Sequence, residues 1–290
     1  MAADANTQIT ELRSGDHACL TFAEAEELFD LTAAYVRDGL AGGLKVIWLS
    51  DEGRGVAVAE LARRGIAVQP AIEAGQMAAE ECEGRLLTGQ VFSADAALGW
   101  LTGQVNSARR EGFGGLRVAV DMSWALRPVA GVEELPAFDQ GLTAELDGGT
   151  ASVLCQYDRE RFDPVTLASV AAFHTCQVSA ATYYHDAVLR ICRQYAPPGI
   201  RIAGELDYQA EEPLALALAE AVRMEGDLVL NLAALAFMDA RCAKMIADAA
   251  QAMAASRPVI LRCSPGPAAV FGRLGLTGVP GIRLVTSSEQ

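Results

Sequence analysis

Two short motifs place a histidine two residues before a cysteine, His17 with Cys19 and His174 with Cys176. Residues two apart on a strand point to the same face, so each pair could present a nitrogen and a sulfur ligand together. Zinc prefers such ligands, and Cys155 in another apolar segment could add a further sulfur. The ordinary alternative is that the cysteines are small buried apolar side chains and the histidines form hydrogen bonds at strand ends. The sequence favours this alternative, so we predict no metal site and no cofactor.

Enzymatic activity has little support in the sequence. Cys155 and His174 could be drawn as a nucleophilic pair, but their spacing says nothing about their geometry. An ATPase needs a glycine-rich loop with Lys and Ser/Thr after its first strand. Here the apolar segment HACLTF is followed by AEAEEL, which has three glutamates and neither glycine nor lysine. Because a triphosphate needs backbone N–H groups and a cation there, we predict that the protein is not an enzyme.

Two further hypotheses stay open from these residues. One is a cryptic enzyme or metal protein that uses His17, Cys19, Cys155 and His174. The other is residual nucleotide binding without hydrolysis.

The elements that would position these residues alternate between strand and helix patterns in the first half. Apolar runs predict strands at residues 17–22, 45–50, 116–124 and 150–158, with helical patterns at 23–40 and 56–65. Such a series is typical of a parallel sheet covered on both faces. Ligands of these sheets bind beyond the carboxyl ends of the strands. Because three strands end in Ser50-Asp51-Glu52, Asp121 and Gln156-Tyr157-Asp158, we predict one polar crevice, with helix capping as the alternative.

Length and charge limit the class of protein. The 290 residues suggest about two domains. The net charge of −14, from 37 acidic and 23 basic residues, argues against nucleic acid or an anionic membrane surface as a partner. Seven cysteines without a CxxC pair, and no N-terminal apolar signal region, predict a cytoplasmic protein. The uncharged run at 165–184 contains His174 and Gln177, so we predict a short helix, a strand and a linker rather than a membrane span.

The second half predicts a smaller α/β unit, with the domain boundary between residues 179 and 186. Two alternating strands, VLRICRQY and GIRIAGELD, are joined by a Pro-Pro-Gly turn and predict a hairpin. Helices at 211–224, 240–254 and 266–274 then alternate with strands at 228–232, 259–262 and 282–285. In the central helix, the spacing of an apolar core face is met by Cys242, Met245, Ile246, Ala249 and Met253.

The second half resembles a STAS domain, the fold of bacterial anti-sigma factor antagonists, in GIRIAGELD, LVLNLAALAFMDARCAK and PVILRCSPGPAAVFGRLGL. In that family a D-S/T-S/T-G motif begins a helix, and the partner kinase phosphorylates its hydroxyl. The phosphate adds about −1.5 to −2 charges and blocks docking. Here Asp239 is followed by Ala240, Arg241 and Cys242, and no Ser or Thr occurs from residue 183 to residue 255. The resemblance therefore implies docking of an anti-sigma factor or related serine kinase without this phosphorylation switch.

The docking surface that this resemblance implies has two parts, the loop after the second strand of the hairpin and the start of the central helix. Its candidate residues are Asp207, Tyr208, Asp239, Ala240, Arg241 and Lys244, with Ala240 and Arg241 as the degenerate phosphorylation site.

The first half resembles a MEDS domain, a sensory module of methanogen and methylotroph regulators, in SGDHACLTF, GFGGLRVAVDMSWAL, LCQYDRERFDP and FHTCQV. MEDS domains resemble RecA-type folds without the phosphate loop. The resemblance implies sensing of a small molecule, with family-typical residues near any pocket: Asp16, His17, Asp121, Trp124, Gln156, Tyr157 and His174.

We therefore expect a RecA-like parallel sheet flanked by helices at residues 10–178, followed by a STAS-like α/β domain at 186–287. Together they would form a non-enzymatic regulator in which the sensory domain controls the docking domain. The alternatives are a degenerate STAS domain that serves only as a scaffold or homodimer contact, and a ligand sensor outside any sigma factor pathway.

Overall fold

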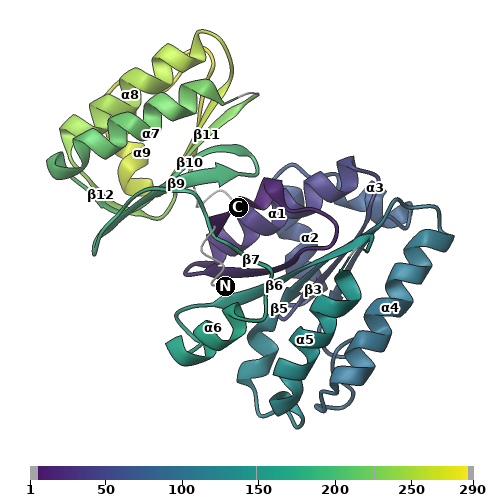
Figure 1. Ribbon diagram of the computed structural model, residues 1–290. Coiled ribbons are helices and arrows are strands. Elements are labelled where there is room, and N and C mark those ends of the chain that lie inside the picture. Colours follow the sequence, from purple (N-terminus) through teal and green to yellow (C-terminus); the bar gives the residue numbers. More distant parts are fainter. Residues whose placement is uncertain (1–5, 148, 225, 287–290) are drawn as a thin grey trace. The chain divides into compact units, whose positions relative to one another are not determined.

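The computed structural model describes residues 6–147, 149–224 and 226–286. The chain divides into two compact units between Ser179 and Ala180 (Figure 1). Each unit has its own sheet and its own hydrophobic core. Within these ranges, no helix has both the length and the apolar character that crossing a membrane requires.

A parallel sheet forms the centre of the first unit and confirms the predicted fold class. Its strand order is β1-β7-β2-β6-β5-β3-β4, and each neighbouring pair runs parallel. The strands are β1 (Asn6–Thr7), β2 (His17–Phe22), β3 (Lys45–Ser50), β4 (Met77–Glu81), β5 (Leu116–Asp121), β6 (Ala151–Asp158) and β7 (Cys176–Val178).

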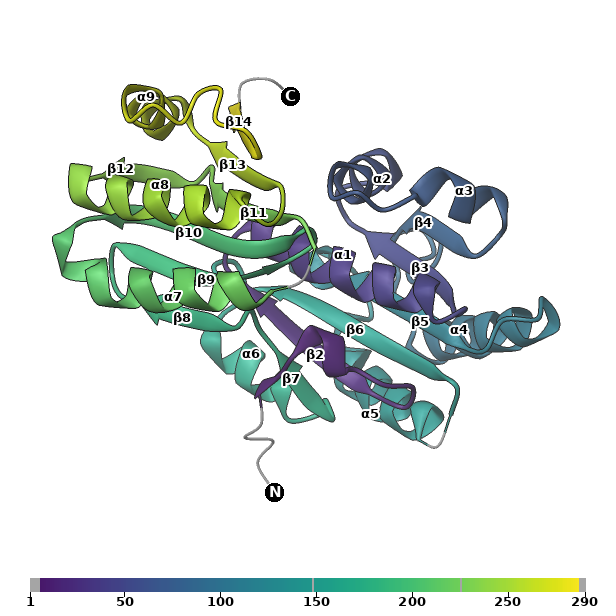
Figure 2. The same cartoon turned by 90° about the horizontal axis from the view of Figure 1, so that it is seen from above.

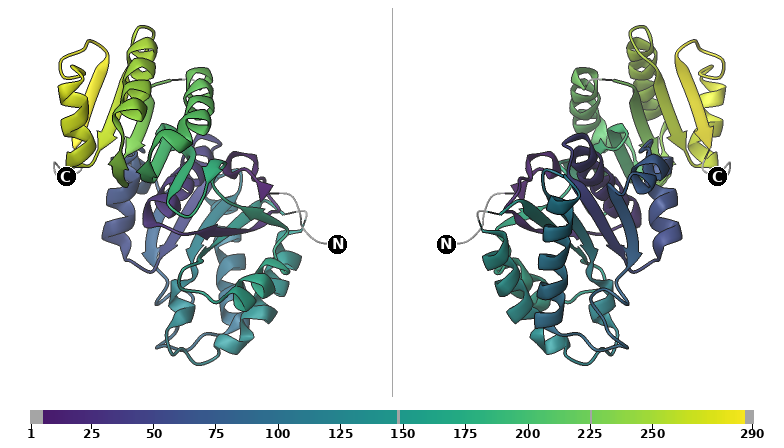
Figure 3. Two further views of the ribbon diagram at one scale, coloured as in Figure 1. Left: turned by 90° about the vertical axis from the view of Figure 1, so that its left-hand side faces the viewer. Right: turned by 90° about the vertical axis from the view of Figure 1, so that its right-hand side faces the viewer.

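Helices cover both faces of this sheet (Figures 2 and 3). One face carries α1 (Ala25–Ala41), α2 (Arg54–Arg63) and α3 (Val68–Glu73). The other carries α4 (Ala94–Arg110), α5 (Leu135–Leu146) and α6 (Pro164–Ala171). Short 3₁₀ helices connect them: η1 (Ile9–Glu11), η2 (Met122–Leu126) and η3 (Val132–Glu134).

The two faces of the sheet differ in chemistry. The α4–α5 side is an apolar core of leucine, valine and aromatic side chains. On the α1 side, Tyr35 shares a hydrogen bond of 2.8 Å with the Ser152 hydroxyl, and Arg117 donates to the Tyr35 carbonyl. These buried polar groups therefore have partners, as stability requires.

Some elements of the first unit differ from the sequence pattern. The strand predicted at 116–124 ends at Asp121, because the residues after it form η2. Strand β4 was not predicted, since its sequence MAAEE carries two acids and it forms an edge of the sheet. The uncharged run at 165–184 forms parts of α6, β7 and β8 (Thr182–His185), in agreement with a short helix and a strand rather than a membrane span.

The second unit is built on a mixed sheet with the order β14-β13-β11-β10-β9-β8, and β12 also pairs with β10. Strands β8, β9 and β10 are antiparallel, and the other pairs are parallel. The further strands are β9 (Leu189–Tyr195), β10 (Pro198–Leu206), β11 (Leu228–Leu232), β12 (Leu235–Met238), β13 (Val259–Cys263) and β14 (Ile282–Thr286). Its helices are η4 (Tyr208–Ala210), α7 (Glu211–Arg223), α8 (Ala240–Ala254) and α9 (Pro265–Arg273), with α7 and α8 side by side (Figure 1).

The predicted hairpin is confirmed, because Tyr195 in β9 lies opposite Pro198 in β10. A glycine is required just after that turn. A Cβ atom at Gly199 would lie 1.8 Å from the Val229 carbonyl oxygen, so only glycine allows β10 to pair this closely with β11. Strand β8 pairs with β9, so the second unit includes residues before 186, which the sequence placed in a linker. The predicted end of this domain, residue 287, lies outside the described residues.

Candidate functional site

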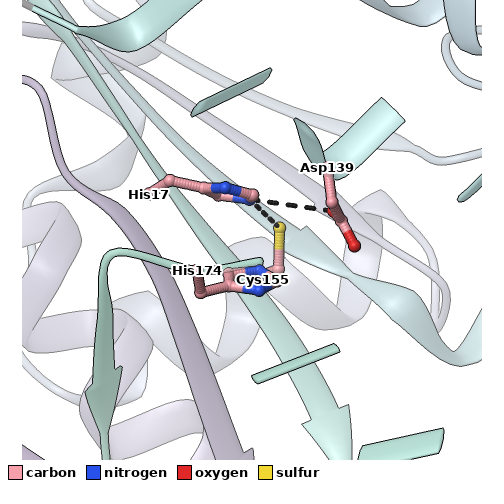
Figure 4. A group of neighbouring side chains, drawn as sticks. All are labelled: His17, Asp139, Cys155 and His174. Carbon is pink, nitrogen blue, oxygen red and sulfur yellow. Dashed lines mark hydrogen bonds and ion pairs between the residues drawn. The ribbon is translucent and has the colours of Figure 1, made fainter. Parts of the chain in front are cut away.

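Four buried polar side chains of the first unit converge between the sheet and its helices: His17, Asp139, Cys155 and His174 (Figure 4). Each contributes one nitrogen, sulfur or oxygen atom, and these atoms all lie within 4.8 Å of one another. Nε2 of His17 is 3.6 Å from Cys155 Sγ and 3.8 Å from Asp139 Oδ1. The four residues are between 0% and 5% exposed. We call this group the His-Asp-Cys cluster.

Adjacent strands and one helix position the cluster. His17 is the first residue of β2, and β2 pairs with β6 so that Cys19 lies opposite Cys155. Side chains two apart on a strand share a face, so His17 and Cys155 point to the same side of the sheet. His174 lies just before β7, the other neighbour of β2. Asp139 lies in the second turn of α5, which packs over this face.

The hydrogen bonds of Thr143 fix the tautomer of His17. Thr143 Oγ1 lies 2.8 Å from His17 Nδ1, and it also donates toward the carbonyls of Asp139 and Phe173. Since a hydroxyl has one proton and carbonyls can only accept, Thr143 accepts a hydrogen bond from Nδ1–H of His17. Nε2 of His17 therefore carries the lone pair that faces Asp139 and Cys155.

His174 is oriented in the same way. Its Nδ1 donates to the Val170 carbonyl at 2.9 Å, which leaves Nε2 with a free lone pair. That Nε2 and Oδ1 of Asp139 are both buried and have no hydrogen-bond partner among the described residues. The His17 and His174 rings lie 3.9 Å apart between centroids, at 34°. Two imidazole lone pairs and a carboxylate oxygen thus share one small buried volume.

Burial controls the protonation of the cluster. Desolvation, together with the neighbouring His174, lowers the pKa of His17 to about 2, and desolvation lowers the pKa of His174 to about 4. Both rings are therefore neutral near pH 7. Burial raises the pKa of the Asp139 carboxyl to about 7 and raises that of the Cys155 thiol, with the Asp139 charge adding to the latter. A nucleophilic cysteine needs a lowered pKa and access to substrate, so Cys155 has the wrong environment for that role.

A cavity of about 540 Å³ lies next to the cluster, between η2, α5 and α6. Asp139 lines this cavity as well as belonging to the cluster. The polar lining comes from Glu133, Asp139, Asp163, Thr166 and Ser169, and none of the described residues that line the cavity is a lysine, arginine or histidine. The apolar lining includes Leu126, Leu135, Phe162, Val170 and Phe173. The volume suits a small organic molecule, and the carboxyl groups favour a neutral or cationic ligand over an anion.

Of the seven predicted ligand residues, three gather here. His17 and His174 belong to the cluster, and the buried Tyr157 ring lies 6.1 Å from that of His174, edge to face. Burial raises the pKa of the Tyr157 phenol, whose hydroxyl also lacks a hydrogen-bond partner among the described residues.

The other four predicted residues lie outside the cluster. Trp124 is 0% exposed and stacks on Phe92 at 4.9 Å. Gln156 points to the α1 face, where it donates to Thr32. Asp16 accepts a hydrogen bond from the amide of Arg13.

Asp121 caps η2 by accepting from the Ser123 amide at 2.9 Å, which agrees with the helix-capping alternative. Its other oxygen accepts from the Asp51 amide at 3.3 Å, so two of the three predicted strand ends also meet. Of the strand-end residues, Tyr157 thus borders the His-Asp-Cys cluster, whereas His17 lies at the amino end of its strand.

Asp139 was not singled out from the sequence, although a signal exists. In α5 it shares the buried stripe with Leu142 and Leu146, where an apolar residue is usual. A carboxyl group in such a stripe needs a partner, and this one faces two histidines and a thiol.

In the second unit, the residues implied by the STAS resemblance lie around the start of α8. Asp239 caps this helix by accepting from the Cys242 amide at 2.7 Å. Cys242 Sγ donates to the Asp207 carbonyl, which brings the loop at Asp207 beside α8. Arg241 forms an ion pair of 2.6 Å with Glu211 at the start of α7.

Ala240, the first residue of α8, lies between Asp239 and Arg241 and has no hydroxyl to accept a phosphate. Lys244 pairs with Asp248 one turn later at 2.8 Å, and Tyr208 is 66% exposed. The structure thus brings the loop at Asp207 and the start of α8 together, whereas no described contact identifies a partner for this surface.

Comparison with known proteins agrees with the resemblance of the first half to a MEDS domain. The model of the family described as MEDS, methanogen/methylotroph, DcmR sensory domain, matches residues 16–175. The search of curated proteins gives no match. Among solved structures, a KaiC-like protein from the hyperthermophilic archaeon Pyrococcus horikoshii OT3 is similar at 12% identity and a TM-score of 0.45, over 63% of this chain and 79% of that one. The family match includes His17, Asp139, Cys155 and His174 and covers more than half of the sequence, so the chain belongs to the MEDS sensory domain family.

Proposed function

We propose that the protein is a non-enzymatic signalling regulator, in which the MEDS domain binds a small molecule and controls docking of the second unit to an anti-sigma factor or related serine kinase. The observation that carries the sensory part is a cavity of about 540 Å³ within a MEDS domain. Sensing requires such an internal volume beside side chains that respond to its occupant. Asp139 fits that requirement, because it contacts both the cavity and the buried cluster.

The docking part rests on the resemblance of the second unit to STAS domains and on the geometry at the start of α8. Asp239 caps the helix, and Arg241 is held by Glu211 at the place where the family has its hydroxyl pair. A fixed positive charge there cannot be added or removed by a kinase. We therefore infer that docking is controlled by the MEDS domain or by the abundance of the protein, and not by phosphorylation at this helix.

Binding of the full chain to purified anti-sigma serine kinases tests the proposal, with Tyr208→Ala as the informative variant. Tyr208 is 66% exposed beside the start of α8, and exposed tyrosines often dominate protein interfaces. We expect Tyr208→Ala to raise the dissociation constant by roughly 30-fold in isothermal titration calorimetry, which corresponds to a loss of about 2 kcal/mol of binding free energy.

Val222→Ala is the matched control. Val222 is similarly exposed, at 59%, but it lies near the end of α7, whereas Tyr208 lies before the start of that helix. This variant should bind as tightly as the wild type. If no anti-sigma kinase binds the wild-type chain, the docking function is wrong. If both variants bind like the wild type, the predicted surface is wrong.

A second candidate function is a scaffold, in which the second unit only forms homodimers. Exposed apolar side chains on α7, Leu216 and Val222, favour this alternative because they could lie at a contact between copies. Native mass spectrometry separates the two functions. A dimer that dissociates in Leu216→Glu, combined with no kinase binding, would support the scaffold over the regulator.

A further inference from the structure

We propose that His17, Asp139, Cys155 and His174 bind one divalent transition-metal ion, and that zinc is the ion their donor atoms fit best. The inference concerns the first unit alone and does not depend on docking of the second unit. The chain has three histidines, and two of them meet at this place. The four residues come from β2, α5, β6 and the segment before β7, so only the folded domain assembles them.

The distances already approach those of a tetrahedral site. Zinc bonds of about 2.0 Å to nitrogen or oxygen and 2.3 Å to sulfur place the atoms of a tetrahedral ligand set with one sulfur roughly 3.3 to 3.5 Å apart. The separations of His17 Nε2 from Cys155 Sγ and Asp139 Oδ1 are 3.6 and 3.8 Å. The widest separation in the cluster is no more than 4.8 Å, so a contraction of at most about 1.5 Å completes the geometry.

The imidazoles are oriented as metal ligands usually are. A ligating histidine normally donates its other N–H to an oxygen, which fixes the tautomer and the ring. His17 donates to Thr143 and His174 to the Val170 carbonyl, and in both rings this leaves the Nε2 lone pair toward the cluster. The orphaned Nε2 of His174 and Oδ1 of Asp139 would each gain a partner in the ion.

Charge balance favours a divalent ion. A buried carboxylate and a buried thiolate are costly unless a cation compensates them. One M²⁺ with one carboxylate, one thiolate and two neutral imidazoles gives zero net charge. The ion would replace the Cys155 thiol proton and any proton held by the Asp139 carboxyl, both of which leave to solvent, and four protein–metal bonds would form. Mixed nitrogen, sulfur and oxygen ligands suit zinc and exclude magnesium or calcium, which take oxygen.

The cavity gives this site an asymmetry. Asp139 is the cluster residue that lines it, so the carboxylate would be the metal ligand on the cavity side. A small molecule in the cavity would then contact the ion or its carboxylate ligand first, while His17, His174 and Cys155 stay behind them. This arrangement links occupancy of the cavity to the coordination of the metal.

Thr143 is a positioning residue for His17, and its replacement tests the tautomer argument. We expect Thr143→Val to weaken zinc affinity by about 10- to 100-fold, because the variant keeps the shape but loses the acceptor for Nδ1–H. Thr143→Ser keeps the hydroxyl and should restore wild-type affinity, as measured by competition with a zinc-sensitive dye. Equal loss in both variants would show that packing, and not the hydrogen bond, was responsible.

The decisive experiment is titration of the full chain with Co²⁺, after expression without a histidine tag and removal of metal by a chelator. We expect one equivalent to bind, with a thiolate-to-cobalt charge-transfer band and the visible bands of a tetrahedral ion, and zinc should displace it. Cys155→Ala should abolish the charge-transfer band. His174→Gln should lower zinc affinity by more than 100-fold, which is more than the loss of a residue that only orients a ligand causes. Matched controls are Cys82→Ala, a buried thiol of the same unit, and His185→Gln, which changes the third histidine.

The wild-type titration decides the matter even if a variant fails to fold. A wild-type protein without a saturable thiolate band at one equivalent overturns the metal site. So does a charge-transfer band that persists in folded Cys155→Ala. Because no kinase is involved, failure here leaves the docking function untouched, and failure of docking leaves the metal site untouched.

Discussion

Replacing Trp124 with alanine is expected to lower the free energy of unfolding of the first unit by about 3 to 5 kcal/mol. The indole is 0% exposed and lies 4.9 Å from the Phe92 ring, which in turn packs edge to face on Phe138. Alanine would leave a cavity among these rings, and a close-packed core relaxes only partly around such a gap. The sequence placed Trp124 among the ligand residues, so the variant also separates a packing role from a binding role.

Guanidinium unfolding followed by tryptophan fluorescence measures this change. The chain's three tryptophans, Trp48, Trp100 and Trp124, all lie in the first unit, so the signal reports that unit even if the two units unfold separately. Trp124→Phe keeps an aromatic ring in the core, so it should lower the free energy of unfolding much less than Trp124→Ala does. An unchanged midpoint for Trp124→Ala would show that the ring is not needed for packing.

The fold could be predicted largely from the sequence because its strongest signals are local. The strand LRVAVD is buried along its whole length in β5, as a continuous apolar run predicts for a parallel sheet covered on both faces. Asp239 followed by a helical pattern correctly predicted α8 from Ala240 to Ala254. Strands β4 and β12 escaped prediction because their partners, β3 and β10, hold them in place and their own sequences are short and mixed.

The candidate site was only partly predictable, because its geometry depends on contacts between distant residues. His17 and Cys155 are 138 positions apart, and His17 and Thr143 are 126 apart. The sequence indicated His17, Cys155 and His174 as residues with the right chemistry, and then favoured isolated buried side chains. Nothing in their spacing could show that α5 adds Asp139 to the same volume. That step needs the packing of the helix on the sheet.

The family-typical residues include some that hold a helix on the sheet and some that border the cluster, and the structure distinguishes the two. Gln156 and Tyr157 are neighbours in β6, so their side chains point to opposite faces. Gln156 bonds to Thr32 on the α1 side, whereas Tyr157 packs beside His174. Resemblance alone cannot distinguish a residue that holds a helix on the sheet from one that borders the cluster. The direction of each side chain makes that distinction, because Tyr157 lies on the same side of the sheet as His174 and Gln156 lies on the other.

Zinc is expected to raise the free energy of unfolding of the first unit by about 4 kcal/mol when free zinc is 1,000 times its dissociation constant. The ligands come from separate elements, so the unfolded chain does not present them together, and binding energy adds to the stability of the folded state. Zinc binding to cysteine and histidine side chains of the unfolded chain would reduce this gain in stability.

Guanidinium unfolding followed by tryptophan fluorescence, with zinc and with chelator, measures the gain in stability. The free energy of unfolding of folded Cys155→Ala should not depend on zinc, whereas that of Cys82→Ala should still rise with zinc. Identical midpoints for the wild type in zinc and chelator would contradict the prediction. A gain that Cys155→Ala retains would place the stabilising ion elsewhere in the protein.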